Sequence, residues 1–299
     1  MRITVRVPAT SANLGPGFDC FGLALDLCNE VTIDTEAEPG VTWEGEGADE
    51  LPTDGTDMIS RAIAFTAGQI ADEAIELPSF SLHGVNRIPI ERGLGSSAAA
   101  AVAGANIANA LLYALSITED PGGPDLVVAD AVAFEGHPDN VLAAMFGGLT
   151  VALAGEYARL VPHPSLDPLV LIPERVRVAT SGAREVLSPT VDRADAVFNI
   201  GHAALTAVAL THHPDLLFLA LRDRLHEEAR ARLMPESADL LEQLRGQEIA
   251  ACLSGAGPSI LVFPTEGQPL PDLPRGWRSI SPGVSDEGFV MEIEVREED

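Results

Sequence analysis

A glycine- and serine-rich segment in the first half of the sequence has residue types that suit the binding of an anion. It reads Gly93-Leu-Gly-Ser-Ser97, and an alanine-rich apolar stretch over residues 98–115 follows it directly. Glycines let backbone N–H groups turn toward an anion, and a helix start adds unpaired N–H donors and the positive end of its dipole. The chain contains no lysine, which excludes a Walker A loop. The segment predicts a phosphate-binding loop of another kind, although a plain glycine turn with a serine cap shares its pattern.

A polar segment near the N-terminus is a second candidate for a site wall. Residues 8–22 follow the first expected strand and combine turn formers with two short polar side chains, Asn13 and Asp19. The segment would build either a tight loop with Asx turns or a polar wall in which Asp19 receives an ammonium group.

Residues 135–140, Glu-Gly-His-Pro-Asp-Asn, crowd polar groups into one turn between two apolar stretches. Glu135 is a hard oxygen donor of the kind that Mg²⁺ prefers, and His137 and Asn140 could contact a substrate hydroxyl. A lone histidine is more often structural, but carboxylates and an amide in the same turn favour a functional site. A further glycine-rich turn, 252–259, fits either a tight hairpin or the close approach of backbone to a ligand.

The elements that must position these segments are read from hydrophobic periodicity and turn residues. Strands are expected at 2–7, 30–35, 79–85, 147–153, 169–172, 177–180, 247–253, 259–263 and 290–295, and helices at 57–69, 98–115, 126–134, 194–210 and 214–232. Strands and helices are mixed without strict alternation, which predicts an α+β fold. We expect two domains, 1–155 and 156–299.

Composition limits the classes of partner. The 299 residues carry a formal net charge of −27, and all 18 basic residues are arginine. Such a chain is repelled by nucleic acids and anionic membranes, so neither is expected as a partner. No apolar stretch reaches the about 18 residues of a membrane span, and no signal peptide is recognisable, so we expect a soluble cytoplasmic protein. The dispersed acidic residues suggest adaptation to a high-salt cytosol, where ions screen self-repulsion.

The motifs at 8–22, 89–97, 135–140 and 252–259 occur here in the order found in the GHMP kinases, and the first and third resemble those of its homoserine kinases. The resemblance spans residues 8–263. It implies a ribosomal protein S5 domain 2-like N-terminal domain, a ferredoxin-like C-terminal domain and an active site between them. ATP would be the phosphoryl donor, Mg²⁺ the metal and L-homoserine the acceptor. A homodimer is common in such kinases.

The resemblance assigns the nucleotide and metal residues. The ATP-binding segment would comprise Pro89, Ile90, Glu91, Arg92, Gly93, Leu94, Gly95, Ser96, Ser97, Ala98 and Ala99. The metal ligands would be Ser97 and Glu135, with Asp130 as a rival because many relatives separate this glutamate further from the histidine. Arg92 is a candidate to replace a lysine contact to phosphate, and Asp57 stands where relatives often carry asparagine near the adenine.

The resemblance also assigns substrate residues. These are Asn13, Asp19, His137, Thr180, Arg184 and Arg230, of which His137 and Arg230 would act in catalysis together with Asn140. Guanidinium groups suit the carboxylate of homoserine, and Asp19 suits its ammonium. Asn140 replaces the catalytic aspartate of other family members, so no strong carboxylate base is expected, with Asp139 a minor candidate. The alternatives are a GHMP kinase for shikimate, pantoate or mevalonate, and a catalytically silent metabolite sensor.

Overall fold

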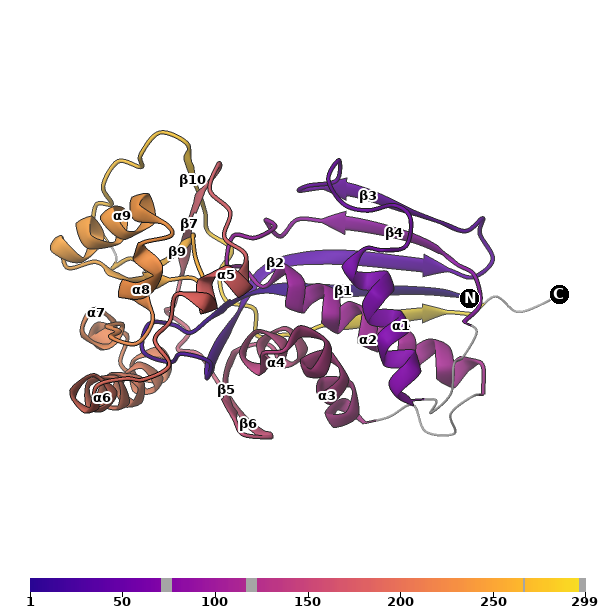
Figure 1. The fold of residues 1–299 in the computed structure, drawn as a ribbon, viewed down its shortest axis with the longest axis horizontal. Coiled ribbons are helices and arrows are strands. Elements are labelled where there is room, and N and C mark those ends of the chain that lie inside the picture. The colour runs from indigo at the N-terminus through magenta and orange to yellow at the C-terminus, as the bar shows by residue number, and fades with distance from the viewer. Residues whose placement is uncertain (71–76, 117–122, 266, 296–299) are drawn as a thin grey trace.

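The structure, a computed structural model, describes residues 1–70, 77–116, 123–265 and 267–295. Its strands form two separate sheets, each packed with helices (Figure 1). The first sheet has seven strands: β1 (Arg2–Ala12), β2 (Phe21–Asp34), β3 (Gly40–Gly45), β4 (Ser81–Asn86), β5 (Leu149–Leu153), β6 (Glu156–Leu160) and β11 (Val290–Glu294). Its main order is β11-β1-β2-β4-β3, with β5 joining β2 to β6. All pairs are antiparallel except β3 with β4.

Four helices pack against one face of this sheet (Figure 1). They are α1 (Met58–Ile70), α2 (Ser96–Ala114), α3 (Pro124–Glu135) and α4 (Pro138–Phe146). The alanines of α2 are small enough for the neighbouring helices and β1 to approach it closely, and most of this helix is buried. At Gly104, for example, a Cβ atom would collide with the Cβ of Ala62 in α1. The small residues therefore allow α2 to form the centre of the domain.

A β-bulge bends the first two strands toward the second domain. The register between β1 and β2 shifts between Pro8 and Ala9, and beyond the shift β1 continues to Ala12. A bulge increases local twist and re-aims the residues that follow it. It carries the segment 9–22 to the end of the sheet where the second domain lies (Figure 1).

The second sheet has the order β10-β7-β9-β8, all antiparallel, formed by β7 (Leu169–Pro173), β8 (Ala250–Leu253), β9 (Ile260–Phe263) and β10 (Trp277–Ile280). The helical elements of this part are α5 (Thr180–Glu185), α6 (Arg193–Thr211), a 3-10 turn η1 (Pro214–Leu216), α7 (Leu217–Ala220), α8 (Glu227–Ala231) and α9 (Pro235–Gly246). Leu240, Leu241 and Leu244 of α9 join the apolar side chains of β7, β8 and β9 in a second hydrophobic core.

Several expected elements differ from the observed ones. The strand expected at 177–180 is wrong, because α5 begins at Thr180 and residues 177–179 form no strand. The single helix expected over 214–232 is wrong as well: it is interrupted after Ala220 by a turn around Asp223 before α8 begins. The helices α4 and α9 were not expected. Both β6 and β11 lie after residue 155 and pair into the first sheet, so the sheets do not divide strictly along the sequence.

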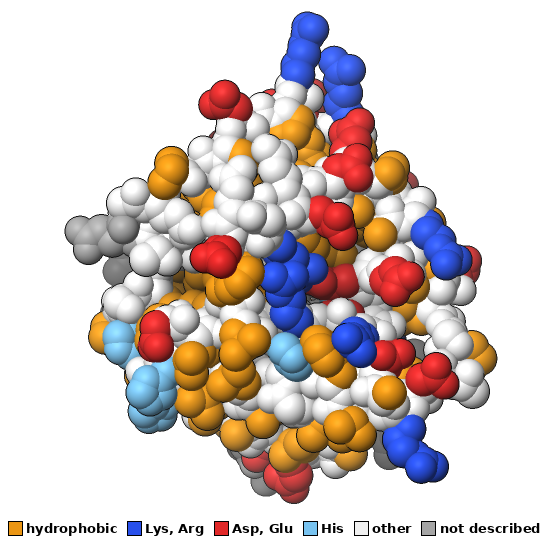
Figure 2. Space-filling view, turned by 90° about the vertical axis from the view of Figure 1, so that its left-hand side faces the viewer, with side chains coloured by type: hydrophobic (Ala, Val, Ile, Leu, Met, Phe, Trp, Pro, Cys, Tyr) orange, Lys and Arg blue, Asp and Glu red, His pale blue; other side chains and the backbone are white. Residues whose placement is uncertain are grey.

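Two of the described helices, α2 and α6, are long and apolar enough to cross a membrane by length and composition alone. The apolar window of α2 is 72% buried inside the first domain, whereas that of α6 is 22% buried. Length and composition are weak evidence, because the core helix of a folded domain meets the same criteria. On the face where α6 lies, charges of both signs are scattered between apolar side chains (Figure 2).

Candidate active site

The glycine loop before α2 is held between β1 and the turn at 254–257. Gly95 caps α2 with a φ of 69°, and Gly93 has a φ of 72°, both in the left-handed region that favours glycine. A Cβ atom on Gly95 would collide with the hydroxyl of Thr10, and one on Gly93 with the backbone oxygen of Ser254. Gly95 provides no side-chain cap, so the first N–H groups of α2 are left for a ligand. This geometry is that of an anion site at a helix start.

A cavity of about 610 Å³ opens at this helix start, between the two domains. Ligand sites are often found at such domain boundaries. Residues of both domains line it, among them these predicted site residues: Asn13, Asp19, Pro89, Ile90, Glu91, Arg92, Gly93, Leu94, Gly95, Ser96, Ser97, Glu135, His137, Asn140, Thr180, Arg184 and Arg230. Ala98 and Ala99 belong instead to the hydrophobic core, where they are fully buried.

Ser97 and Glu135 form a pair of oxygen donors beside the loop. The Ser97 hydroxyl in the first turn of α2 donates a short hydrogen bond to Oε2 of Glu135, the last residue of α3. Burial raises the pKa of Glu135, the hydrogen bond from Ser97 opposes this shift, and the nearby Asp139 adds to it. A hydroxyl and one carboxylate at a phosphate site fit Mg²⁺, which usually takes few protein ligands and completes its shell with phosphate oxygens and water. No group of three His, Cys, Asp or Glu side chains suited to a metal occurs among the described residues.

Asn140, in the first turn of α4, has a fixed orientation. Its Oδ1 accepts a hydrogen bond of 2.7 Å from the buried hydroxyl of Thr10, and its backbone N–H donates to Oδ1 of Asp139 at 2.8 Å. Its Nδ2 donates a long hydrogen bond of 3.5 Å to the same oxygen of Asp139, so one of the two amide hydrogens is left to donate. Burial raises the pKa of Asp139 to about 6. Burial and the charge of Arg184 lower the pKa of His137, which caps α4.

Two arginines from the second domain face the loop at 13–19. Arg184 of α5 pairs with Asp19, with 3.1 Å between Nη1 and Oδ2 and a shorter contact through Nη2. Arg230 of α8 is 1% exposed, and burial lowers its pKa to about 10, so it stays charged at neutral pH. Both guanidinium groups lie over the ring of Phe18, at 5.5 and 5.3 Å from its centre. Two positively charged side chains at the cavity are therefore packed against one aromatic ring.

The chain is similar to known proteins over nearly its whole length. The N-terminal and C-terminal domain profiles of the GHMP kinases match residues 58–148 and 206–278. A homoserine kinase of Leifsonia xyli is 45% identical over 87% of this chain and 80% of that protein. One from a Mycobacterium strain, JLS, is 42% identical over 98% of this chain and 92% of its own length.

The chain belongs to the homoserine kinases of the GHMP kinase family. A crystal structure of the homoserine kinase from Cytophaga hutchinsonii covers 97% of both chains with a TM-score of 0.78 at 24% identity, which speaks for the fold alone. The two-domain α+β GHMP kinase fold predicted from the sequence is confirmed.

Three residues considered for nucleotide or metal contacts have surroundings in the structure that favour other roles. The guanidinium of Arg92 donates to the backbone oxygens of Pro173 and Glu174 at 2.9 Å each, which favours a role in joining the loop to β7 over a contact to phosphate. Asp57 caps α1 by accepting the N–H groups of the first turn. Asp130 of α3 is 8% exposed and lies outside the cavity lining, so the geometry favours Glu135 as the metal ligand.

The Asn13 side chain bonds to protein on both of its polar ends. Its Nδ2 donates to the oxygen of Gly255 at 2.7 Å, and its Oδ1 accepts from the backbone N–H of Asp19 at 3.0 Å. Asn13 thus joins the loop to the turn at 254–257 and orients Asp19. Thr180, exposed at the start of α5, borders the same cavity.

Sequence reasoning missed Thr10, Phe18 and His226. Thr10 and Phe18 lie inside the motif at 8–22, but nothing in their spacing shows that they touch Asn140 and Arg230. A signal for His226 was present, because it lies one helical turn before Arg230, at the i, i+4 spacing that brings side chains together.

Proposed function

We propose that this protein transfers the γ-phosphoryl group of ATP to the side-chain hydroxyl of L-homoserine, forming O-phospho-L-homoserine for threonine synthesis. One observation carries the proposal. A single cavity has an anion-binding helix start with Ser97 and Glu135 at one part of its lining and the Arg184–Asp19 pair with Arg230 at another. The first part suits the phosphates of a nucleotide, and the second suits a zwitterionic amino acid.

The nucleotide phosphates would accept hydrogen bonds from the N–H groups of the loop at 93–97. Ser97 and Glu135 would hold Mg²⁺ against them, and the ion would neutralise phosphate charge when bound. Glu135 must be ionised to do this, and the hydrogen bond from Ser97 favours its charged form.

The substrate carboxylate would bind to Arg184 and Arg230, and Asp19 would receive its ammonium. Because Arg184 and Asp19 already contact one another, a zwitterion would insert its two charged groups beside an existing pair. Shikimate, pantoate and mevalonate carry a carboxylate but no amine, which would leave Asp19 without a ligand partner. This argument favours homoserine within the family.

Phosphoryl transfer itself needs positioning more than a strong base. The hydroxyl oxygen forms a bond to the γ-phosphorus, the bond to the β-phosphate oxygen breaks, and ADP leaves. The hydroxyl proton can pass to the transferred phosphoryl group or to water. Asn140 has no proton-accepting role, because its Oδ1 is occupied by Thr10 and its Nδ2 only donates. It would orient the acceptor oxygen, with His137 beside it, and hold the reactants in line.

A coupled assay of ADP release tests this function. We expect turnover with ATP and L-homoserine that far exceeds turnover with shikimate, pantoate or mevalonate at equal concentration. ADP release that favours one of the other acceptors would replace homoserine with that acceptor. Nucleotide binding without release on any of them would favour a metabolite sensor.

We further propose that the protein works in a cytoplasm of high ionic strength, as a homodimer, without a nucleic-acid or membrane partner. The net charge of −27 supports the high ionic strength, because salt screens the self-repulsion, and it disfavours anionic partners. The midpoint of thermal unfolding should rise between dilute buffer and molar KCl. An equal midpoint in both would remove the argument for salt adaptation, and sedimentation measures the oligomeric state.

A further inference from the structure

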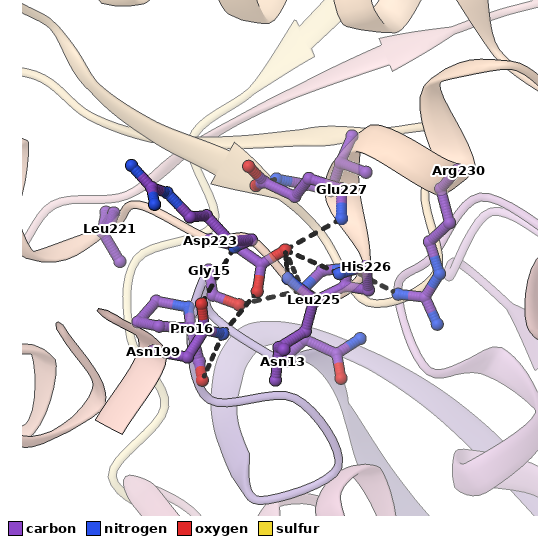
Figure 3. A network of polar contacts seen from close by, with 12 residues as sticks. Asn13, Gly15, Pro16, Asn199, Leu221, Asp223, Leu225, His226, Glu227 and Arg230 are labelled. Carbon is purple, nitrogen blue, oxygen red and sulfur yellow. Dashed lines mark hydrogen bonds and ion pairs between the residues drawn. The ribbon is translucent and has the colours of Figure 1, made fainter. Parts of the chain in front are cut away.

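A chain of buried polar groups connects Arg230 to the backbone of the N-terminal loop (Figure 3). Nη1 of Arg230 lies 2.9 Å from Nδ1 of His226, and Nε2 of His226 lies 2.8 Å from the backbone oxygen of Gly15. Arg230 is 1% exposed and His226 is 0% exposed. His226 therefore joins a residue of the second domain to the loop that carries Asn13 and Asp19.

The partners of His226 fix its protonation. A guanidinium group only donates hydrogen bonds, so Nδ1 of His226 must accept with its lone pair. The backbone oxygen of Gly15 only accepts, so Nε2 must carry the proton. The ring is thus neutral, in the Nε2–H tautomer, and it can meet both partners only in this form. Burial lowers the pKa of His226, in agreement with a neutral ring.

The ring of His226 is also fixed in orientation. It stacks on Phe18 with 5.3 Å between the ring centres. The carboxylate of Asp223 accepts the backbone N–H groups of Leu225, His226 and Glu227 at 2.8 to 3.0 Å, which holds the turn before α8. Asn199 of α6 donates to the other oxygen of Asp223 at 2.7 Å (Figure 3). The ring can therefore act as a rigid support.

Arg230 has one end free for a ligand. Its Nε donates to the oxygen of Ala183 and its Nη1 to His226 and to the oxygen of Gly255, both backbone contacts being 3.3 Å long. Within the described part of the chain, Nη2 has no hydrogen-bond partner, and Arg230 lines the cavity. Because Nε and Nη1 of Arg230 are held by hydrogen bonds within the protein, Nη2 is the nitrogen that can bind an anion.

We propose that His226 is a positioning residue for the phosphoryl acceptor: it orients Arg230 so that Nη2 meets the carboxylate of the amino-acid substrate, and it couples that contact to the loop at 13–19. The inference rests on the proposed function for the identity of the substrate. The physical reason is preorganisation, because an arginine already held in place loses less side-chain entropy on binding.

Two substitutions separate the functions of the two ring nitrogens. His226→Asn keeps an acceptor near the position of Nδ1, and His226→Gln keeps a donor near that of Nε2. We expect His226→Gln to raise the KM for homoserine about tenfold, as for loss of one hydrogen bond to a charged group, with the KM for ATP changed less than about twofold. His226→Asn should raise the KM for homoserine less than His226→Gln does. His213→Gln, at an exposed histidine, is the matched control and should leave both constants unchanged.

A double-mutant cycle tests that His226 acts through Arg230. In an Arg230→Met background, His226→Gln should cause no further rise in the KM for homoserine. An additional rise equal to that in the wild-type background would overturn the proposal, as would equal KM effects of the Asn and Gln variants. Circular dichroism of each variant identifies a loss of fold.

The protonation state of the two His226 ring nitrogens can be measured on the wild-type protein, so this test depends neither on the folding of a variant nor on activity. Long-range ¹H–¹⁵N spectra should show His226 as the Nε2–H tautomer, and a proton on Nδ1 would refute the contact to Arg230. If the wild-type protein released no ADP with homoserine, the proposed function would fail. The tautomer would still decide whether His226 supports Arg230.

Discussion

Removal of the Arg184 guanidinium should weaken the binding of homoserine far more than the binding of ATP. Arg184 lies on α5 at the cavity and contacts both oxygens of Asp19. In Arg184→Ala the substrate carboxylate would lose a cationic partner, and Asp19 would lose the group that orients it. The phosphate loop would keep all of its contacts, because Arg184 makes none to residues 93–97 among those described.

The magnitude follows from the exposure of the pair. A hydrogen bond to a charged group contributes about 1.5–3 kcal/mol, and the Arg184 side chain is 31% exposed, so solvent screening favours the lower half of that range. Arg230 remains to hold the carboxylate. A loss of about 2 kcal/mol corresponds to a rise of about 30-fold in the KM for homoserine.

The assay is coupled ADP release with one substrate varied while the other is saturating. Arg177→Ala is the matched control, because Arg177 also pairs with a carboxylate, Glu50, but lies on the surface outside the cavity lining. Its KM values should stay within about twofold of the wild type, as for an exposed ion pair. Equal increases in both KM values for Arg184→Ala, or a similar increase for Arg177→Ala, would refute the assignment of Arg184 to the substrate.

Two further predictions concern the carboxylates. Glu135→Gln should raise the Mg²⁺ concentration needed for half-maximal rate about tenfold or more, because an amide is a poorer ligand than a carboxylate. If a Mg²⁺ titration gave the same concentration for variant and wild type, another group would have to bind the metal. Burial raises the pKa of Asp139 from its ordinary 3.8 to about 6, so the folded state binds a proton at this carboxyl more tightly than the unfolded state does. The protonated Asp139 carboxyl therefore contributes stability at low pH, and this stability is lost as the pH rises through about 6. Asp139→Asn should therefore be more stable than the wild type by about 3 kcal/mol above pH 6, with the difference vanishing below about pH 4. Urea unfolding at a series of pH values measures it, and a difference independent of pH would contradict the raised pKa.

Much of the fold and of the site could be predicted because the signals are local. The left-handed glycines at 93 and 95, the alanine-rich helix after them and the end of α3 at Glu135–Gly136 depend on residues close together in the sequence. Local steric limits and periodicity decide such features. The helix expected over 214–232 failed for a non-local reason, because Asn199 of α6 holds Asp223, which caps the turn that interrupts it.

The sequence by itself therefore predicted most of the candidate site residues: the glycine loop at 93–97, the polar segment at 135–140, and Arg184 and Arg230. Only the tertiary structure decided which of them meet. Asp19 and Arg184 are 165 residues apart, Thr10 and Asn140 are 130 apart, and Gly15 and His226 are 211 apart. Such pairs form because a bulge in the pairing of β1 with β2, where β2 carries the extra residues, and the packing of two sheets bring the segments to one cavity. No local pattern encodes those distances, since they depend on how every intervening element packs.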